Sequence, residues 1–263
     1  MENIYLDLTT AFNRGRFRAV ICSGQAVVLH RLAIMSKDGD WILREDEAAL
    51  AHVLSVLGER GAIYRYGAPL DVRWLRGGWS SHFEFPHDGV RVRTDFFSRP
   101  PRLGSERMRQ MWDELDGSDP PFTPAADLAL IKMTQREKDY PVIGELARIM
   151  PRLKDRLRFS RSAQDLCKLA ALQPDDVAAL VAERPLLSHA LEQNPDRLAE
   201  AIDAERRGLI KADAVRMRRY EQAAAEWRER WPQTRQRVEG LPLDVAHRII
   251  TDEASGRLPE VPD

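Results

Sequence analysis

Over roughly the first 100 residues, apolar positions follow two periods in turn, one typical of strands and one typical of helices. The segments FRAVIC and DWILR are short, apolar and rich in β-branched or aromatic residues, so both predict strands. SGQAVVLHRLA predicts a helix that begins just after Gly24, and DEAALAHVLSVLGERG predicts a second one. This alternation predicts an α/β (α+β) fold with a mixed sheet flanked by helices.

Further segments of the same half extend this pattern. SSHFEF and VRVRTDFF, connected through Asp88-Gly89, predict a β-hairpin, because Asp-Gly accepts the positive φ angles of a tight turn. LDVRWLRGG alternates in polarity and predicts another strand, whereas NIYLDLTTAF has helical spacing.

From about residue 104 onward the spacing is helical, and no segment predicts a strand. Pro124 and Pro141 each fall where the first turn of a helix is expected, and residues 196–231 predict a long helix rich in Arg and Glu. The tail at 251–263 is expected to fray. We therefore expect an α/β domain over residues 1–150 and an all-helical region over 151–263.

Composition narrows the class of protein only modestly. The 263 residues are 43% apolar and carry a net charge of −1, so no overall field favours nucleic acid or a membrane surface. No apolar run approaches the length of a membrane span, and the first residues do not resemble a signal peptide. The two cysteines, Cys22 and Cys167, are far apart, which argues against a disulfide framework and indicates a reducing cytoplasm.

The turn after the first expected strand is a candidate phosphate site. Ser23 and Gly24 connect a buried strand to a helix, and the free N–H groups at a helix start suit an anion. A plain strand-to-helix connection is the alternative, since neither a Walker A motif nor a GxGxxG motif is present.

The segment SKDGDWIL carries two carboxylates at the start of a strand. Residues two apart in a strand share a face, so Asp38 and Asp40 would project side by side and repel unless a hard cation such as Mg²⁺ lies between them. Asp95, in VRVRTDFF, is a candidate third carboxylate. The alternatives are an ordinary Asp-Gly turn at residue 38 and a salt-bridged solvent face formed by Asp95 with Arg91 and Arg93.

The order of these features resembles the minimal nucleotidyltransferase fold of the polymerase-β-like superfamily. SGQAVVLHRLAIMSKDGDWIL is similar to the Gly-Gly/Ser, Ala, His and DxD stretch of the branch that contains abortive-infection-type toxins. DLALIKMTQREKDYPVIGEL is similar to the helical Lys…Arg-x-Lys-Asp segment of that branch. The chain departs from the pattern at Arg31, Ile34 and Gly39, and the likeness covers roughly residues 17–150.

The resemblance implies an Mg²⁺-dependent enzyme that moves a nucleoside monophosphate from an NTP to an acceptor. Asp38, Asp40 and Asp95 would hold the metal, or Asp95 would act as a base toward the acceptor hydroxyl. Ser23 and the Gly24 N–H would contact the β- and γ-phosphates.

In the second similar segment, Lys132 would neutralise the triphosphate. Arg136, Lys138 and Asp139 would orient that lysine or form a salt-bridge cluster. The implied acceptor is a hydroxyl of tRNA or of a protein, and an antitoxin-like partner protein is a further expectation. The alternative is a degenerate member of the fold that binds a nucleotide or a partner without catalysis, which Ile34 and Gly39 favour.

Three other features each allow two interpretations. His30 lies on an apolar helix face and is either structural or catalytic. Trp79, after Gly77-Gly78, belongs to a bulge or loop or stacks on a base. Residues 206–237 form an ion-paired solvent-exposed helix or an RNA-contacting face.

Overall fold

The computed structural model describes residues 3–262, and residues 1, 2 and 263 lie outside the described part. The chain forms two compact units, one of Met1–Thr123 with Arg218–Asp263 and one of Pro124–Met217. These bounds are not those of the two domains expected from the sequence, and that division stays a prediction.

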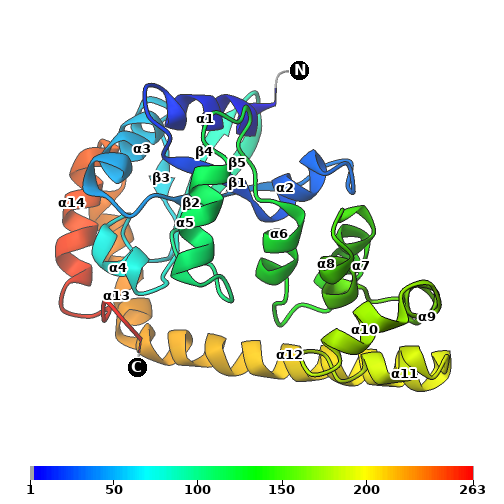
Figure 1. The fold of residues 1–263 in the computed structure, drawn as a ribbon. Helices are drawn as coiled ribbons and strands as arrows, with labels where there is room; N and C mark the ends of the chain where they lie inside the picture. The colour runs from blue at the N-terminus through cyan, green and yellow to red at the C-terminus, as the bar shows by residue number, and fades with distance from the viewer. Residues whose placement is uncertain (1–2, 263) are drawn as a thin grey trace. The chain divides into compact units, whose positions relative to one another are not determined.

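The first unit contains a five-stranded sheet in the order β1-β2-β5-β4-β3 (Figure 1). β2 and β5 are parallel, and the other neighbours are antiparallel, so the sheet is mixed. The strands are β1 (Ala19–Cys22), β2 (Asp38–Leu43), β3 (Ile63–Tyr64), β4 (Ser81–His87) and β5 (Val90–Phe97). The fold class is thereby confirmed as a mixed sheet flanked by helices, followed by an all-helical region, α6–α14.

One face of the sheet packs against an aromatic core. The rings of Trp41 and Phe96 stack 5.4 Å apart, and Phe12 of helix α1 (Ile4–Asn13) packs edge-on against both. The Trp41 indole N–H donates to the Thr9 hydroxyl at 2.9 Å, which satisfies the one polar atom of a fully buried ring. This core fixes the positions of β2 and β5, so polar residues between the buried ones face the opposite side.

Helices surround the sheet within the first unit, and α14 packs beside α3 (Figure 1). Asp46 caps α3 by accepting the Ala49 N–H at 2.7 Å, as its position in the sequence predicts. The helices of this unit are α1 (Ile4–Asn13), α2 (Ser23–Leu29), α3 (Glu47–Glu59), α4 (Val72–Arg76), α5 (Ser105–Glu114), α13 (Ala225–Val238) and α14 (Leu243–Ala254).

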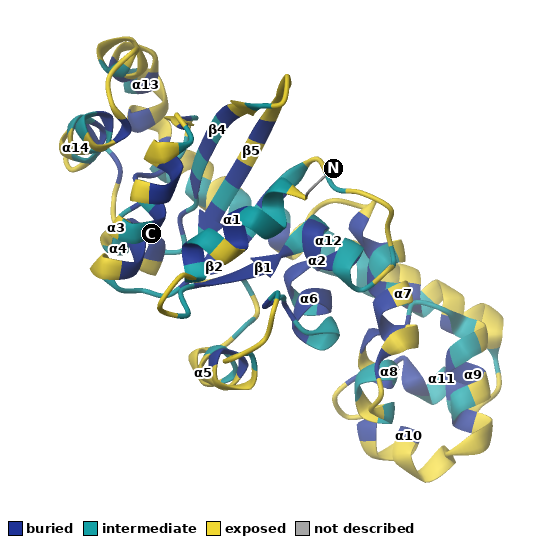
Figure 2. Cartoon of the chain, turned by 90° about the horizontal axis from the view of Figure 1, so that it is seen from above, coloured by how far each residue is buried: buried dark blue, intermediate teal, exposed yellow. Residues whose placement is uncertain are grey.

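The predicted hairpin is confirmed, and its turn lies in solvent. Asp88 and Gly89 have φ angles of 48° and 76°, the pair of positive values that a type I′ turn requires. Figure 2 shows that the turn end of β4 and β5 is exposed, whereas the part nearer the sheet centre is buried.

The strand predicted in LDVRWLRGG is wrong, because the segment forms helix α4. The Asp71 side chain accepts the Arg73 N–H at 2.9 Å and so starts the helix, and Gly78, with φ of 82°, ends it. Trp74 and Leu75 are adjacent and both buried, which a strand with alternating faces and one buried side does not allow.

The expectation of a frayed tail is also wrong for the described residues before Asp263. Leu258 is buried, and its carbonyl accepts the Trp74 indole N–H at 3.0 Å. The Trp79 indole N–H donates to the Pro259 carbonyl at 2.9 Å. The sequence pattern did not predict β3 or α14 either, since β3 has two residues and lies in an irregular segment.

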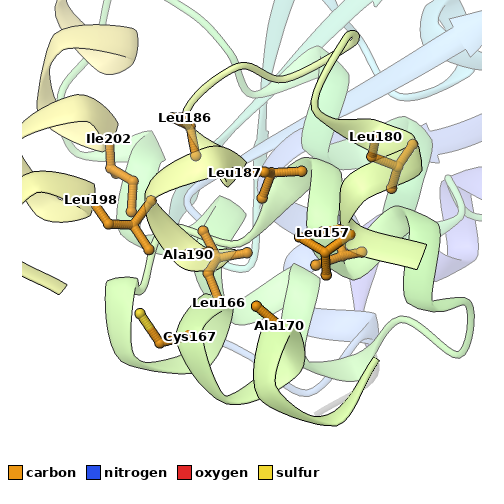
Figure 3. Close-up of a cluster of buried hydrophobic side chains, with 11 residues drawn as sticks. Leu157, Leu166, Cys167, Ala170, Leu180, Leu186, Leu187, Ala190, Leu198 and Ile202 are labelled. Atoms are coloured by element: carbon orange, nitrogen blue, oxygen red, sulfur yellow. The ribbon is translucent and has the colours of Figure 1, made fainter. Parts of the chain in front are cut away.

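All regular secondary structure in the described residues of the second unit is helical. Arg184 connects its parts, since its guanidinium donates to the carbonyls of Leu157 and Ser160 and to the Glu205 carboxylate. A cluster of buried apolar side chains forms its core (Figure 3), including Leu157, Leu166, Val177, Leu187 and Leu198. Its helices are α6 (Ala125–Ile131), α7 (Asp139–Ile149), α8 (Leu153–Phe159), α9 (Ala163–Leu172), α10 (Pro174–Leu180), α11 (Leu187–Leu191) and the larger part of α12 (Pro195–Ala223).

No helix within residues 3–262 is both long and apolar enough to cross a membrane.

Candidate functional site

The three predicted carboxylates lie on one face of two neighbouring strands. Asp38 and Asp40 are partly buried and alternate along β2 with the buried Gly39 and Trp41. The Cα partner of Asp40 on the parallel strand β5 is Asp95. Residues opposite one another in register point to the same side of a sheet, so the sheet brings Asp40 and Asp95 next to each other.

Gly39 is explained by the packing of the opposite face. A Cβ atom at this position would lie 2.4 Å from the Trp41 ring and 2.5 Å from the Tyr5 ring. Two aromatic rings cover the backbone at this position and leave no room for a side chain, and the strand includes the glycine all the same.

Asp38 carries an oxygen that is buried and has no hydrogen-bond partner, Oδ1. The loop before it is held in place, since Gln25 donates to the Ser36 carbonyl and the Tyr5 hydroxyl donates to the Lys37 carbonyl at 2.7 Å. Burial raises the pKa of Tyr5, and the negative charges of Asp38 and Asp40 raise it further. The start of β2 is therefore an electronegative site with an unsatisfied acceptor.

Asp95 is engaged by two side chains that the sequence analysis did not identify. Its Oδ1 atom lies 2.7 Å from His82 Nδ1 and 3.4 Å from Arg65 Nη1. His82 is the Cα partner of Asp95 in the hairpin, so the hairpin register could have pointed to it. Arg65 comes from the short strand region that the sequence pattern missed.

The Ser23-Gly24 turn has a structural explanation. Ser23 has a φ angle of 49°, and a Cβ atom on Gly24 would lie 2.2 Å from the Ser36 hydroxyl oxygen. Because Ser36 packs against the backbone of Gly24, this position requires glycine. The phosphate-binding role of Ser23 and Gly24 stays a prediction.

Two other candidates have contacts that favour the structural alternative. His30 Nε2 lies 3.0 Å from the Thr123 carbonyl oxygen, and burial lowers the pKa of His30. Trp79 is buried, its indole N–H is used by Pro259, and its ring packs edge-on against Tyr220.

The predicted Lys132 segment forms a closed cluster inside the second unit. Lys132 and Asp139 are both buried, with Nζ and Oδ1 3.5 Å apart. The other oxygen of Asp139 accepts from the Thr134 hydroxyl and from Arg136 Nε, each at 2.8 Å. Lys138 precedes α7 and is exposed. The contact of Lys132 with a triphosphate stays a prediction.

The donor set on β2 suits a hard cation. Mg²⁺ is usually held by one or two carboxylates together with substrate phosphates, and the buried Oδ1 atom of Asp38 is an acceptor in need of such a partner. Over residues 3–262, no group of three or more His, Cys, Asp or Glu side chains is arranged to hold a metal ion. The residues present thus fit an ion that takes part of its coordination from a nucleotide.

Comparison with known proteins adds no relative. No protein-family model, no curated protein and no solved structure matches the chain.

Proposed function

We propose that the protein is an Mg²⁺-dependent nucleotidyltransferase that moves a nucleoside monophosphate from an NTP to an acceptor hydroxyl. The observation that carries the proposal is the unpartnered Oδ1 atom of Asp38, next to Asp40 and on the face that contains Asp95. A buried carboxylate oxygen without a donor is costly, and a cation delivered with the substrate relieves that cost.

Asp38 and Asp40 would hold the metal, which neutralises phosphate charge and lowers the barrier to displacement. The acceptor oxygen attacks the α-phosphorus, the bond from that phosphorus to the bridging oxygen breaks, and pyrophosphate leaves. Asp95, fixed by His82 and Arg65, would hold the second metal or take the proton of the acceptor hydroxyl.

The acceptor and the partners belong to the same proposal. A hydroxyl of tRNA or of a protein is the acceptor that the resemblance favours, and an antitoxin-like protein is the implied partner. A cytoplasmic location is likewise a proposal.

A second candidate function is nucleotide or partner binding without catalysis. The engagement of Asp95 by His82 at 2.7 Å supports it, since one oxygen of that carboxylate is already used. Ile34, which departs from the family pattern, is 99% exposed just before the acidic residues and contributes no polar group there.

Calorimetric titration with each NTP, with and without Mg²⁺, tests the proposal. We expect metal-dependent binding by the parent and none by Asp38→Ala or Asp40→Ala. Asp113→Ala is the matched control, because Asp113 is an exposed acid on helix α5 of the same unit. Equal binding by the parent and the Asp40→Ala variant would show that the site is misassigned.

Transfer of label from an α-labelled NTP to tRNA or protein then separates the enzyme from the non-catalytic binder. Binding together with transfer supports the first candidate, and binding without transfer to either acceptor supports the second.

A further inference from the structure

Two arginines on β5 share the face of the carboxylates but differ in their contacts. Arg91 and Arg93 are both exposed and lie two residues apart, so they point to the same side of the strand. Arg91 Nη1 lies 3.6 Å from Glu84 Oε1. The guanidinium of Arg93 forms no ion pair or side-chain hydrogen bond with any residue in the described range 3–262.

The register places Arg93 directly between two acids. Its Cα partner on β2 is Asp38, and its Cα partner on β4 is Glu84. Glu84 already has two arginines near its carboxylate, Arg91 and Arg65, the latter with Nε at 3.9 Å. Asp38 keeps its buried oxygen unpartnered, so Arg93 does not satisfy it either.

We infer that Arg93 binds the terminal phosphates, β and γ, of the NTP that Asp38 and Asp40 hold through the metal, an inference that rests on the proposed function. Neighbouring strands are about 4.8 Å apart, and an arginine side chain is long enough to extend over the adjacent strand. The guanidinium fork matches phosphate oxygens in geometry and charge. An unpaired guanidinium one strand away from the metal-binding carboxylates is positioned for that contact.

Two other roles of Arg93 are alternative outcomes of the test. A solvated Arg93 would contribute nothing to ligand binding, as many exposed charged residues do. An Arg93 that swings onto Asp38 would act as an internal counter-ion and compete with the metal.

The experiment compares Arg93→Ala with Arg91→Ala in calorimetric titrations with Mg-NTP and with the matching nucleoside monophosphate. We expect Arg93→Ala to weaken Mg-NTP binding by about tenfold or more, the loss typical of a hydrogen bond to a charged group. Arg91→Ala, which removes a residue already paired with Glu84, should leave the affinity within about twofold. Monophosphate binding should be the same in parent and both variants, and Arg93→Lys should retain part of the affinity.

The outcomes separate this inference from the function beneath it. If the parent binds Mg-NTP and Arg93→Ala binds it equally well, Arg93 is only solvated and the inference is wrong while the proposed function stands. Tighter binding by Arg93→Ala would identify the counter-ion and also overturn the inference. Absence of Mg-NTP binding by the parent would overturn the proposed function itself. Because Arg93 is exposed, the variants should keep the far-UV circular dichroism of the parent.

Discussion

Asp139 in the second unit is buried and Asp38 in the first is partly buried with one buried oxygen, yet the two carboxylates differ in their partners. Asp139 has a buried lysine near one oxygen and two donors at 2.8 Å on the other. Asp38 has a buried oxygen that nothing in the described chain satisfies. The first arrangement stabilises a fold, whereas the second leaves the cost of an unsatisfied buried acceptor.

The two segments that carry the family resemblance differ in how far their own packing explains them. The Lys132 segment has a structural explanation in its own unit, because Lys132 and Arg136 both pair with Asp139. The SKDGDWIL segment does not, because its aromatic core explains Gly39 and Trp41 but leaves Oδ1 of Asp38 without a partner. The case for a functional site is therefore stronger at β2 than at Lys132.

The largest effect is expected from Asp139→Ala. This change leaves the ammonium of Lys132 buried without its partner, so we expect the free energy of unfolding to fall by about 3–5 kcal/mol. Urea denaturation followed by far-UV circular dichroism measures it. The double variant Lys132→Met with Asp139→Ala should recover part of the loss, because no unpaired charge remains. Strictly additive costs in this double-mutant cycle would contradict the pairing.

The two units should also differ in the pH at which they lose stability. In the first unit, burial lowers the pKa of His247 and of His30 below the ordinary value of 6.5. The unfolded chain then binds protons that the folded chain does not, so stability is complete above about pH 6.5 and falls as the pH drops below it. In the second unit, burial alone would raise the pKa of Glu205, but Arg184 and Arg161 outweigh it and lower the pKa below the ordinary 4.5. Stability from Glu205 is therefore present above about pH 4.5 and lost below it.

Tryptophan fluorescence can follow the first unit, since all six tryptophans lie within it. The second unit can be followed by hydrogen exchange of α9–α11. Each histidine contributes a slope of at most about 1.4 kcal/mol per pH unit. His247→Gln should flatten the fluorescence-detected dependence between pH 6.5 and the lowered pKa, with no effect on exchange in α9–α11. An unchanged slope in that variant would contradict the assignment.

Much of the fold follows from local patterns, and the exceptions have physical causes. The hairpin was predicted because the residues Asp88 and Gly89 favour a tight turn by themselves. Helix α3 was predicted because it starts at Asp46, whose side chain can cap it. LDVRWLRGG was mistaken for a strand because one helical turn is too short for its period to appear. The buried tail depends on Trp74, which is distant in sequence, and no local pattern contains that information.

The candidate site divides in the same way. The shared face of Asp38 and Asp40 follows from the two-residue period of a strand, and it was predicted. The contacts of Asp95 with His82 and Arg65 depend on the register between strands, which spacing along one strand does not fix. The unpartnered oxygen of Asp38 is a property of packing and was not open to prediction from the sequence.

The smallest change in stability is expected from Asp38→Ala. This expectation contrasts with the large loss expected from Asp139→Ala. Removal of this partly buried carboxylate takes away no hydrogen bond of Oδ1 and relieves the cost of that buried oxygen, so the free energy of unfolding should stay within about 0.5 kcal/mol or rise by about 1 kcal/mol. The same urea denaturation measures it, without Mg²⁺ or nucleotide in the buffer. A loss of more than about 2 kcal/mol would mean that Asp38 stabilises the fold as Asp139 does. The proposed difference between these two carboxylates would then be wrong. An unchanged or raised stability combined with lost Mg-NTP binding is the pattern of a residue kept for its ligand at the expense of the fold.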